Sequence, residues 1–306
     1  MTTLKDLTAS VRQRLLNLSR KRKEDFNLVL TRFGIERLLY RLYKSEYADD
    51  FILKGAMLFQ LWSTTPHRPT RDVDLLSFGS PDPEVIANIF RQICNVPVEA
   101  DGVAFDPASV AAEAIREDAI YDGIRVIIMG RLGMARIPLQ IDVGFGDAVL
   151  PTPERMVFPT LLELPAPELR AYRRETVIAE KFHAMVDLGM ANSRMKDFFD
   201  IRYLATTFAY DGRDLCQAIE STFAARKTAI PASLPIALSR DFAADPAKGT
   251  QWSAFLKRSK LDQGASDLAD VIASIHVFLW PPTAALSKNQ TFALLWNPSG
   301  PWVEKT

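Results

Sequence analysis

The segment HRPTRDVDLL, residues 67–76, places two carboxylates at the edge of a short apolar run. Side chains alternate along a β-strand, so residues two positions apart point to the same face. If this segment is a strand, Asp72 and Asp74 project together while the apolar residues between and after them point into the core. Two like charges this close raise each other's pKa. The pattern therefore leaves two interpretations, namely solvated acids paired with Arg68 or Arg71, or ligands of a cation.

The bulk composition is that of an ordinary globular chain. Its 306 residues are enough for two domains, and its 37 basic and 37 acidic residues give no net charge. A neutral total gives no bulk attraction to nucleic acid, although a local basic patch is sufficient. The absence of a signal-peptide pattern and the two distant cysteines, Cys94 and Cys216, predict reduced thiols in a cytoplasmic protein. No apolar run is judged long enough to span a bilayer, so no membrane contact is expected.

Hydrophobic periodicity predicts helices at both ends of the chain and strands in its centre. Apolar residues recur at helical spacing through residues 1–50, and the chain after about residue 210 is again helical. The basic run Arg20–Lys23 is either a solvated helix end or a patch that contacts phosphates. Strands are predicted at RDVDLLSF, YDGIRVIIMGRL and RIPLQIDVGFGD, and the last two are joined by a turn at Gly130–Gly133.

The remaining segments are assigned from capping and turn residues. Residues 151–172 are proline-rich and are expected to wind over the surface, and the stretch from Pro281 is expected to be a poorly ordered tail or a docking segment. Helices are predicted to start near Gly55, to follow Ser80 or Asp82, to end at Gly189, and to follow Asn192 or Ser193 as cap.

A third acid lies in the strand RIPLQIDVGFGD. Asp142 stands between two apolar residues, and an aspartate inside an apolar strand is rarely there for packing. If this strand lies beside RDVDLL with Asp142 on the same face, three carboxylates converge. Such a set can hold divalent ions for phosphoryl or nucleotidyl transfer, and oxygen ligands suit Mg²⁺.

Two further groups could bind a triphosphate. Gly55 opens a helix, where exposed amides and a missing side chain suit a phosphate, and Lys54 stands beside it. Lys181 lies in the middle of a helix, and Asp197 and Asp200 share one face at the start of the next helix. A lysine from one helix and a carboxylate from the other could grip a triphosphate and orient a hydroxyl. Asp197 could instead have a purely structural role, because the helix dipole stabilises an acidic side chain near the start of a helix.

Three blocks of the chain match a known family in order. The segments LKGAMLFQLW with HRPTRDVDLL, then LQIDVGFGD, then AEKFHAMVDLGMANSRMKDFFDI resemble the AbiEii/AbiGii-type nucleotidyltransferase toxins, within the DNA polymerase β-like nucleotidyltransferase superfamily. The resemblance covers about residues 10–205. It implies an α+β fold with a small mixed β-sheet core and N-terminal helices over residues 1–155, and a mainly helical C-terminal region over residues 156–306.

The resemblance also assigns roles to residues. It implies that Asp72 and Asp74 hold Mg²⁺, that Lys181 contacts the nucleotide phosphates, and that Asp197 or Asp200 completes the site. The superfamily has Gly–Ser where this chain has Gly55–Ala56. The full set of candidates is Asp72, Asp74, Lys181, Asp197 and Asp200 for catalysis, Asp142 as a further metal ligand, Lys54, Gly55 and Arg71 for the nucleotide, and Ser63, Thr64, Thr65 or Thr70 in place of the missing serine.

The expected activity is transfer of a nucleoside monophosphate from an NTP to a hydroxyl, with release of pyrophosphate. The resemblance implies an RNA acceptor, foremost a tRNA 3′ end, and a toxin of a toxin–antitoxin system linked to phage defence, with a separate antitoxin protein as partner. Two alternatives stay open. One is transfer to a protein hydroxyl by an AMPylating or kinase-like enzyme, and the other is a non-catalytic binding module with the same fold.

Overall fold

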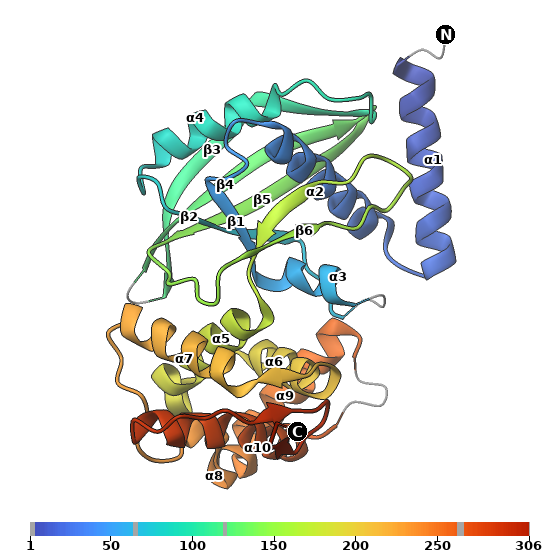
Figure 1. Cartoon of the computed structure of the whole chain (residues 1–306). Coiled ribbons are helices and arrows are strands. Elements are labelled where there is room, and N and C mark those ends of the chain that lie inside the picture. The colour runs from blue at the N-terminus through green and yellow to red at the C-terminus, as the bar shows by residue number, and fades with distance from the viewer. Residues whose placement is uncertain (1–3, 64–66, 119–120, 262–265, 306) are drawn as a thin grey trace. The chain divides into compact units, whose positions relative to one another are not determined.

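The computed structural model describes residues 4–63, 67–118, 121–261 and 266–305, and the chain forms two compact units (Figure 1). The expected α+β fold, with a mixed sheet and helices at both ends, is confirmed. The sequence places the division after residue 155, whereas residues 154–172 belong to the first unit because their strands join its sheet. Unit 1 comprises Met1–Gly146 and Glu154–Tyr172, and unit 2 comprises Asp147–Pro153 and Arg173–Thr306.

Unit 1 is built around a seven-stranded sheet in the order β3-β4-β5-β2-β1-β7-β6. The central strand β2 pairs antiparallel with β1 and parallel with β5, which makes the sheet mixed. The three strands predicted from the sequence are found as β2, β4 and β5. The bounds are β1 Phe51–Lys54, β2 Asp72–Ser77, β3 Val103–Asp118, β4 Tyr121–Leu132, β5 Ala135–Phe145, β6 Glu154–Val157 and β7 Glu168–Ala171.

Four described strands of unit 1 were not predicted from the sequence, for physical reasons. Strand β1 is buried on both faces, so it reads as a continuous apolar run rather than an alternating one. Strand β3 is interrupted by an irregularity between Asp106 and Ala111, which breaks its period. The segment 151–172, expected to wind over the surface, contains β6 and β7, and β7 pairs parallel with β1. That expectation was therefore wrong for these two strands.

The helices of unit 1 are α1 Leu4–Arg22, α2 Phe26–Lys44, α3 Phe59–Trp62 and α4 Pro83–Cys94. Of the two predicted caps of α4, the structure uses Asp82, whose side chain accepts from two backbone amides of the first turn. Helix α2 packs against β5 through Gly34. A Cβ at Gly34 would lie 2.8 Å from Cγ2 of Ile137, so glycine is what lets the helix approach the sheet this closely.

A buried ion pair on α2 holds the segment between β6 and β7. Glu36 and Arg37 are each 1% exposed, and their side chains contact each other at 3.1 Å. The backbone N–H of Leu161 donates to Glu36 Oε2 at 2.7 Å, and Arg37 Nη2 donates to the carbonyl of Pro165 at 2.8 Å. Burial raises the pKa of Glu36 to about 7, although the charge of Arg37 opposes this rise.

Glu36 makes stability depend on pH. Because the folded state holds the Glu36 proton more tightly, this contribution is fully present below about pH 4.5 and is lost as pH rises through about 7. We expect the free energy of unfolding to fall by up to about 3 kcal/mol over that range, and Glu36→Gln to remove this slope. Urea unfolding from about pH 5 to about pH 8 measures it. The exposed Glu84→Gln should follow the wild type, and an unchanged slope in Glu36→Gln would contradict the assignment.

Unit 2 is a bundle of helices with a small three-stranded sheet in the order β10-β9-β8. Helix α5 ends at Gly189 as predicted. Helix α6 begins one or two residues later than expected, since Arg194 is its N-cap and neither Asn192 nor Ser193 caps it. The bounds are α5 Arg174–Leu188, α6 Met195–Thr207, α7 Gly212–Ala225, α8 Arg240–Ala244, α9 Pro246–Ser259, α10 Leu268–Ser287, β8 Tyr210–Asp211, β9 Leu295–Trp296 and β10 Trp302–Val303.

The C-terminal stretch differs from its prediction. Helix α10 continues through Pro281 and Pro282, and the residues after it form β9 and β10, so the expected poorly ordered tail is wrong. Trp296 is buried and its indole N–H donates to the carbonyl of Ala205 at 2.7 Å. By length and composition, α10 is also the one described helix apolar enough to cross a membrane, contrary to the sequence-based judgement. It packs against α6 and α7, as a core helix does.

Candidate active site

The acid pair of β2 alternates with core residues as the sequence predicts. Val73 and Leu75 are each 1% exposed, whereas Asp72 is exposed and Asp74 is half-buried. The two aspartates therefore share the face of the strand opposite to that of Val73 and Leu75. This face is the natural place for a ligand because its carboxylates reach solvent.

Strand register extends the acid pair into a row of charges across the sheet. Asp74 is paired in register with Lys54 of β1 on one side and with Asp142 of β5 on the other. Asp142 is in turn paired with Arg125 of β4. Lys54, Asp74, Asp142 and Arg125 are called the charge row below. The next row on the opposite face is wholly apolar and buried, and consists of Leu53, Leu75, Val143 and Ile124.

Asp142 lies beside Asp74 as predicted, but it is already engaged. Arg125 donates through Nε to Oδ1 at 2.9 Å and through Nη2 to Oδ2 at 2.8 Å, a two-pronged contact. Gln140 Nε2 also approaches both oxygens, at 3.3 and 3.1 Å. The hydrogen bonds that Arg125 donates to Asp142 are the main cause that raises the pKa of Arg125, so the guanidinium stays charged. No sequence pattern points to Arg125 as a site residue, because its partner depends on strand register.

Gly55 fits against Asp74 with no room for a side chain. It begins a 3₁₀ helix, Gly55–Leu58, directly after β1, and its φ of +72° is one that residues with a side chain rarely adopt. A Cβ at this position would lie 1.9 Å from Oδ2 of Asp74. Lys54, the preceding residue, is 7% exposed and belongs to the charge row. Glycine is therefore required here, because the Asp74 carboxylate fills the space that a side chain would take.

The second predicted group forms a compact ion cluster in unit 2. Lys181 Nζ on α5 contacts Asp197 Oδ1 at 2.6 Å and Asp200 Oδ2 at 2.9 Å, both on α6. Arg194 Nε adds a contact to Asp197 Oδ2 at 2.7 Å. Both aspartate side chains are 0% exposed. Burial alone would raise the pKa of Asp197, but the charges of Lys181 and Arg194 outweigh it and hold the pKa below its ordinary value.

The candidate residues of both units lie in a part of the chain that matches a known protein family. The model of the nucleotidyltransferase AbiEii toxin of type IV toxin–antitoxin systems matches residues 37–274, which include both units' candidate residues. The chain belongs to the AbiEii family. It is therefore a nucleotidyltransferase of the toxin–antitoxin class, and the recognition made from the three sequence blocks is confirmed.

Two solved structures resemble this AbiEii protein. A candidate nucleotidyltransferase from H. pylori is 15% identical, with a TM-score of 0.46, and covers 85% of this chain and 96% of its own. JHP933 from Helicobacter pylori is 16% identical, with a TM-score of 0.44, and covers 84% of this chain and 92% of its own. No curated protein matches the chain significantly.

The acids of this AbiEii chain fit a divalent ion only in part. Within the described residues, no group of three or more histidine, cysteine, aspartate or glutamate side chains is arranged to hold a metal. Asp72 and Asp74 remain as a two-carboxylate set, in which Asp74 packs directly against Gly55. Such a set suits Mg²⁺, which commonly takes one or two protein carboxylates and completes its shell with water and substrate phosphates.

The other predicted contacts of the AbiEii site are less well defined. Arg71 is exposed and directly precedes Asp72. Of the hydroxyls that could replace the missing serine, Thr70 donates to the carbonyl of Asp72 at 3.4 Å, and Ser63 lines a cavity. Thr64 and Thr65 lie outside the described residues.

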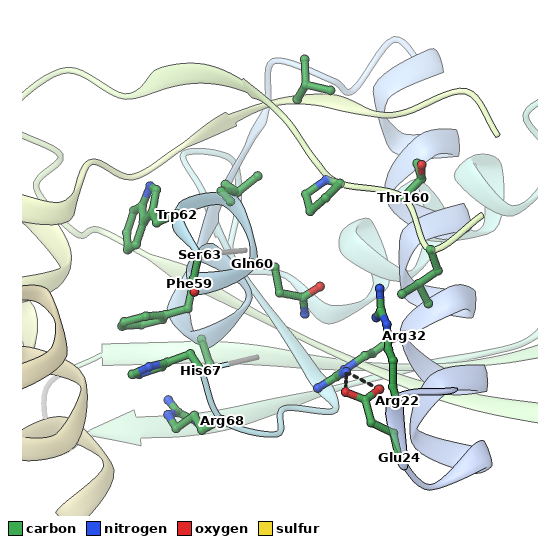
Figure 2. A pocket seen from close by; sticks show the side chains of 15 residues that line it. Arg22, Glu24, Arg32, Phe59, Gln60, Trp62, Ser63, His67, Arg68 and Thr160 are labelled. Carbon is green, nitrogen blue, oxygen red and sulfur yellow. Dashed lines mark hydrogen bonds and ion pairs between the residues drawn. The ribbon is translucent and has the colours of Figure 1, made fainter. Parts of the chain in front are cut away.

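The cavity at Ser63 was not predicted. It has a volume of about 660 Å³ and lies within unit 1, between α3, the junction of α1 and α2, and the segment after β6 (Figure 2). Ala56, the residue after Gly55, belongs to its lining, so the cavity begins one residue from the site of the acid pair. Its other residues come from positions 22 to 161, which no local sequence pattern connects. Two sequence signals fall on it, namely the basic run Arg20–Lys23, because Arg22 lines the cavity, and Ser63 as a substitute for the missing serine.

Proposed function

We propose that this enzyme transfers a nucleoside monophosphate from an NTP to the 3′-hydroxyl of an RNA, with Mg²⁺ held by Asp72 and Asp74. The observation that supports it is the acid pair on the accessible face of β2, with Gly55 pressed against Asp74. Family membership supports NTP as the substrate, and the RNA acceptor, foremost a tRNA 3′ end, is the finer part of the proposal.

The residues of the acid pair and Gly55 act by binding and positioning. Bound Mg²⁺ would neutralise charge on the triphosphate and lower the pKa of the attacking hydroxyl. Asp72 and Asp74 would fix the position of that ion, and Gly55, having no side chain, lets the Asp74 carboxylate lie directly against the backbone that begins the 3₁₀ helix. The acceptor oxygen forms a bond to the α-phosphorus, the bond from this phosphorus to the bridging oxygen breaks, pyrophosphate leaves, and the hydroxyl proton passes to solvent.

The remaining roles stay predictions. Asp142 is proposed as a ligand of a second ion. This role requires Arg125 to release one of the two carboxylate oxygens of Asp142. Lys181 is proposed to neutralise phosphate charge, with Asp197 and Asp200 holding its ammonium group in place. For Lys54 and Arg71 we propose electrostatic contact with the nucleotide.

Toxin–antitoxin membership also bears on partners and place of action. The family implies a cognate antitoxin, which we propose is a separate protein. A tRNA acceptor would place the reaction in the cytoplasm. The two free cysteines are consistent with this, because the cytoplasm keeps thiols reduced. A role in phage defence is part of the same proposal.

A labelled-nucleotide assay tests the activity. The protein is incubated with Mg²⁺, each α-labelled NTP in turn and total tRNA, beside an Asp72→Asn/Asp74→Asn double variant. We expect label on RNA with the wild type and none with the variant. Label on protein would instead support the AMPylating alternative. Label on RNA that persists in the double variant would overturn the assignment of the acid pair.

A further inference from the structure

The cavity of unit 1 has one wall that carries guanidinium groups. Arg22 ends α1 and Arg32 lies on α2, and both line the cavity together with Glu24 between them in sequence (Figure 2). Arg32 Nη1 contacts Glu24 at 3.1 Å, while its Nε is buried and has no hydrogen-bond partner. Arg32 as a whole is only 9% exposed. A buried donor without an acceptor is costly in the free protein, and an anion that reached it would remove this cost.

The opposite wall is aromatic. Phe59 is covered on one face by the His67 ring, with centroids 4.1 Å apart, and Trp62 stands edge-on against Phe59 at 5.6 Å. These contacts fix the orientation of Trp62, which remains partly exposed and lines the cavity. Gln60 points into the space between the two walls (Figure 2). A flat ring stacks on an indole, and an amide can hydrogen-bond its edge.

The charge and the volume of the cavity together suit a nucleotide as ligand. The lining holds three arginines, the third being Arg68, against the single acid Glu24, so it attracts anions. A volume of about 660 Å³ lies within the range of small-molecule sites. A nucleotide can contact both walls at once, with its anionic phosphate at Arg22 and Arg32 and its base stacked on Trp62.

The position of the arginines favours an RNA end over the incoming NTP. In the proposed function the triphosphate lies with the Mg²⁺ at Asp72 and Asp74, and Ala56, which follows the Gly55 that packs against Asp74, lines this end of the cavity. An NTP whose base occupied the cavity would therefore leave Arg22 and Arg32 without a phosphate. A terminal ribonucleotide of an RNA carries its phosphodiester on one side and its 3′-hydroxyl on the other. It can place the phosphodiester on the arginines and direct the hydroxyl towards Asp74.

We propose that this cavity is the acceptor subsite, which binds the 3′-terminal nucleotide of a single-stranded RNA through Arg22, Arg32 and Trp62. The inference rests on the proposed function for its catalytic meaning. Binding itself requires neither Mg²⁺ nor NTP, so it can be measured separately.

Direct binding tests the subsite. A fluorescein-labelled hexaribonucleotide with a free 3′-hydroxyl is titrated with the full chain in EDTA, and anisotropy is recorded. We expect Arg22→Glu and Trp62→Leu each to raise the Kd about tenfold, through a lost phosphate contact and a lost stack respectively. Lys21→Glu is the matched control, because it makes the same charge change in the same basic run and does not line the cavity. We expect it to change the Kd by less than about threefold.

Each alternative result is decisive. Equal effects of Arg22→Glu and Lys21→Glu would overturn the subsite and indicate general electrostatic attraction. Free nucleoside 5′-monophosphate competing as well as the hexaribonucleotide would overturn it in favour of a free-nucleotide site. If transfer to RNA occurs while Arg22→Glu and Trp62→Leu leave the KM for RNA unchanged, the inference fails and the proposed function stands. If the RNA binds as expected and no transfer occurs, the proposed function fails instead.

Discussion

Asp74→Asn is expected to lower the rate of nucleotide transfer by about 1,000-fold while leaving the fold intact. The substitution keeps the shape of the side chain and removes the charge that would hold a divalent ion. Asp74 stands between Lys54 and Asp142 in the charge row and packs against Gly55, so the substitution removes the carboxylate at the middle of the acid group. The measurement is the initial rate of NMP transfer at saturating NTP and Mg²⁺.

Glu113→Gln is the matched control for Asp74→Asn. Glu113 continues the charge row by pairing in register with Arg125, but it lies on β3 and is exposed. Its loss removes the same unit of charge at a distance from the acid pair, and we expect the rate to change by less than about threefold. An Asp74→Asn enzyme that kept more than about a tenth of the wild-type rate would contradict a metal role for this residue.

Lys181→Met is expected to destabilise the protein by about 3–5 kcal/mol. The lysine neutralises two carboxylates that are shut off from solvent, at 2.6 and 2.9 Å, and its removal leaves their charges poorly compensated. Transfer activity should also fall, if Lys181 contacts nucleotide phosphates as predicted. Urea unfolding gives the stability, and the transfer assay below the unfolding transition gives the activity.

Two further variants separate the structural role of Lys181 from the catalytic one. Lys257→Met removes an exposed lysine of α9 and is expected to leave stability within about 0.5 kcal/mol of wild type. Lys181→Met combined with Asp200→Asn removes one buried charge with its partner and should recover much of the lost stability. If activity recovered together with stability, Lys181 would be a structural residue only. An unchanged unfolding midpoint in Lys181→Met would contradict the buried cluster itself.

Alternation along β2 is a strictly local property, and for that reason the sequence predicts it well. Asp72 and Asp74 face away from Val73 and Leu75 because the period of a strand is two residues. The caps of α4 and α5 are also local and were found. Strand β1 was missed because a strand buried on both faces loses the alternating signal.

Features that depend on strand register, or on packing between segments far apart in the chain, could not be predicted from the sequence. That Asp142 pairs with Asp74 could be stated only as a condition, since a shift of one residue would have turned it to the other face. Its contact with Arg125 depends on a second register, between β4 and β5. The cavity required α2, α3 and the segment after β6 to meet, and chain segments this far apart carry no shared period. The burial of Asp197 likewise depends on how α5 and α6 pack.

The charge row has a consequence for the order in which ligands arrive. Asp74 and Asp142 are flanked by Lys54 and Arg125, so the four charges cancel within the protein. Asp72, on the same face, adds one negative charge beyond this balance, which is little to hold a bare divalent ion, and the ion pair of Arg125 with Asp142 in the charge row forms without one. Chelators should therefore leave the melting temperature unchanged. The ion is instead expected to bind together with the triphosphate that carries it. In magnesium alone the enzyme should therefore hold no ion, and ion binding should follow the concentration of NTP.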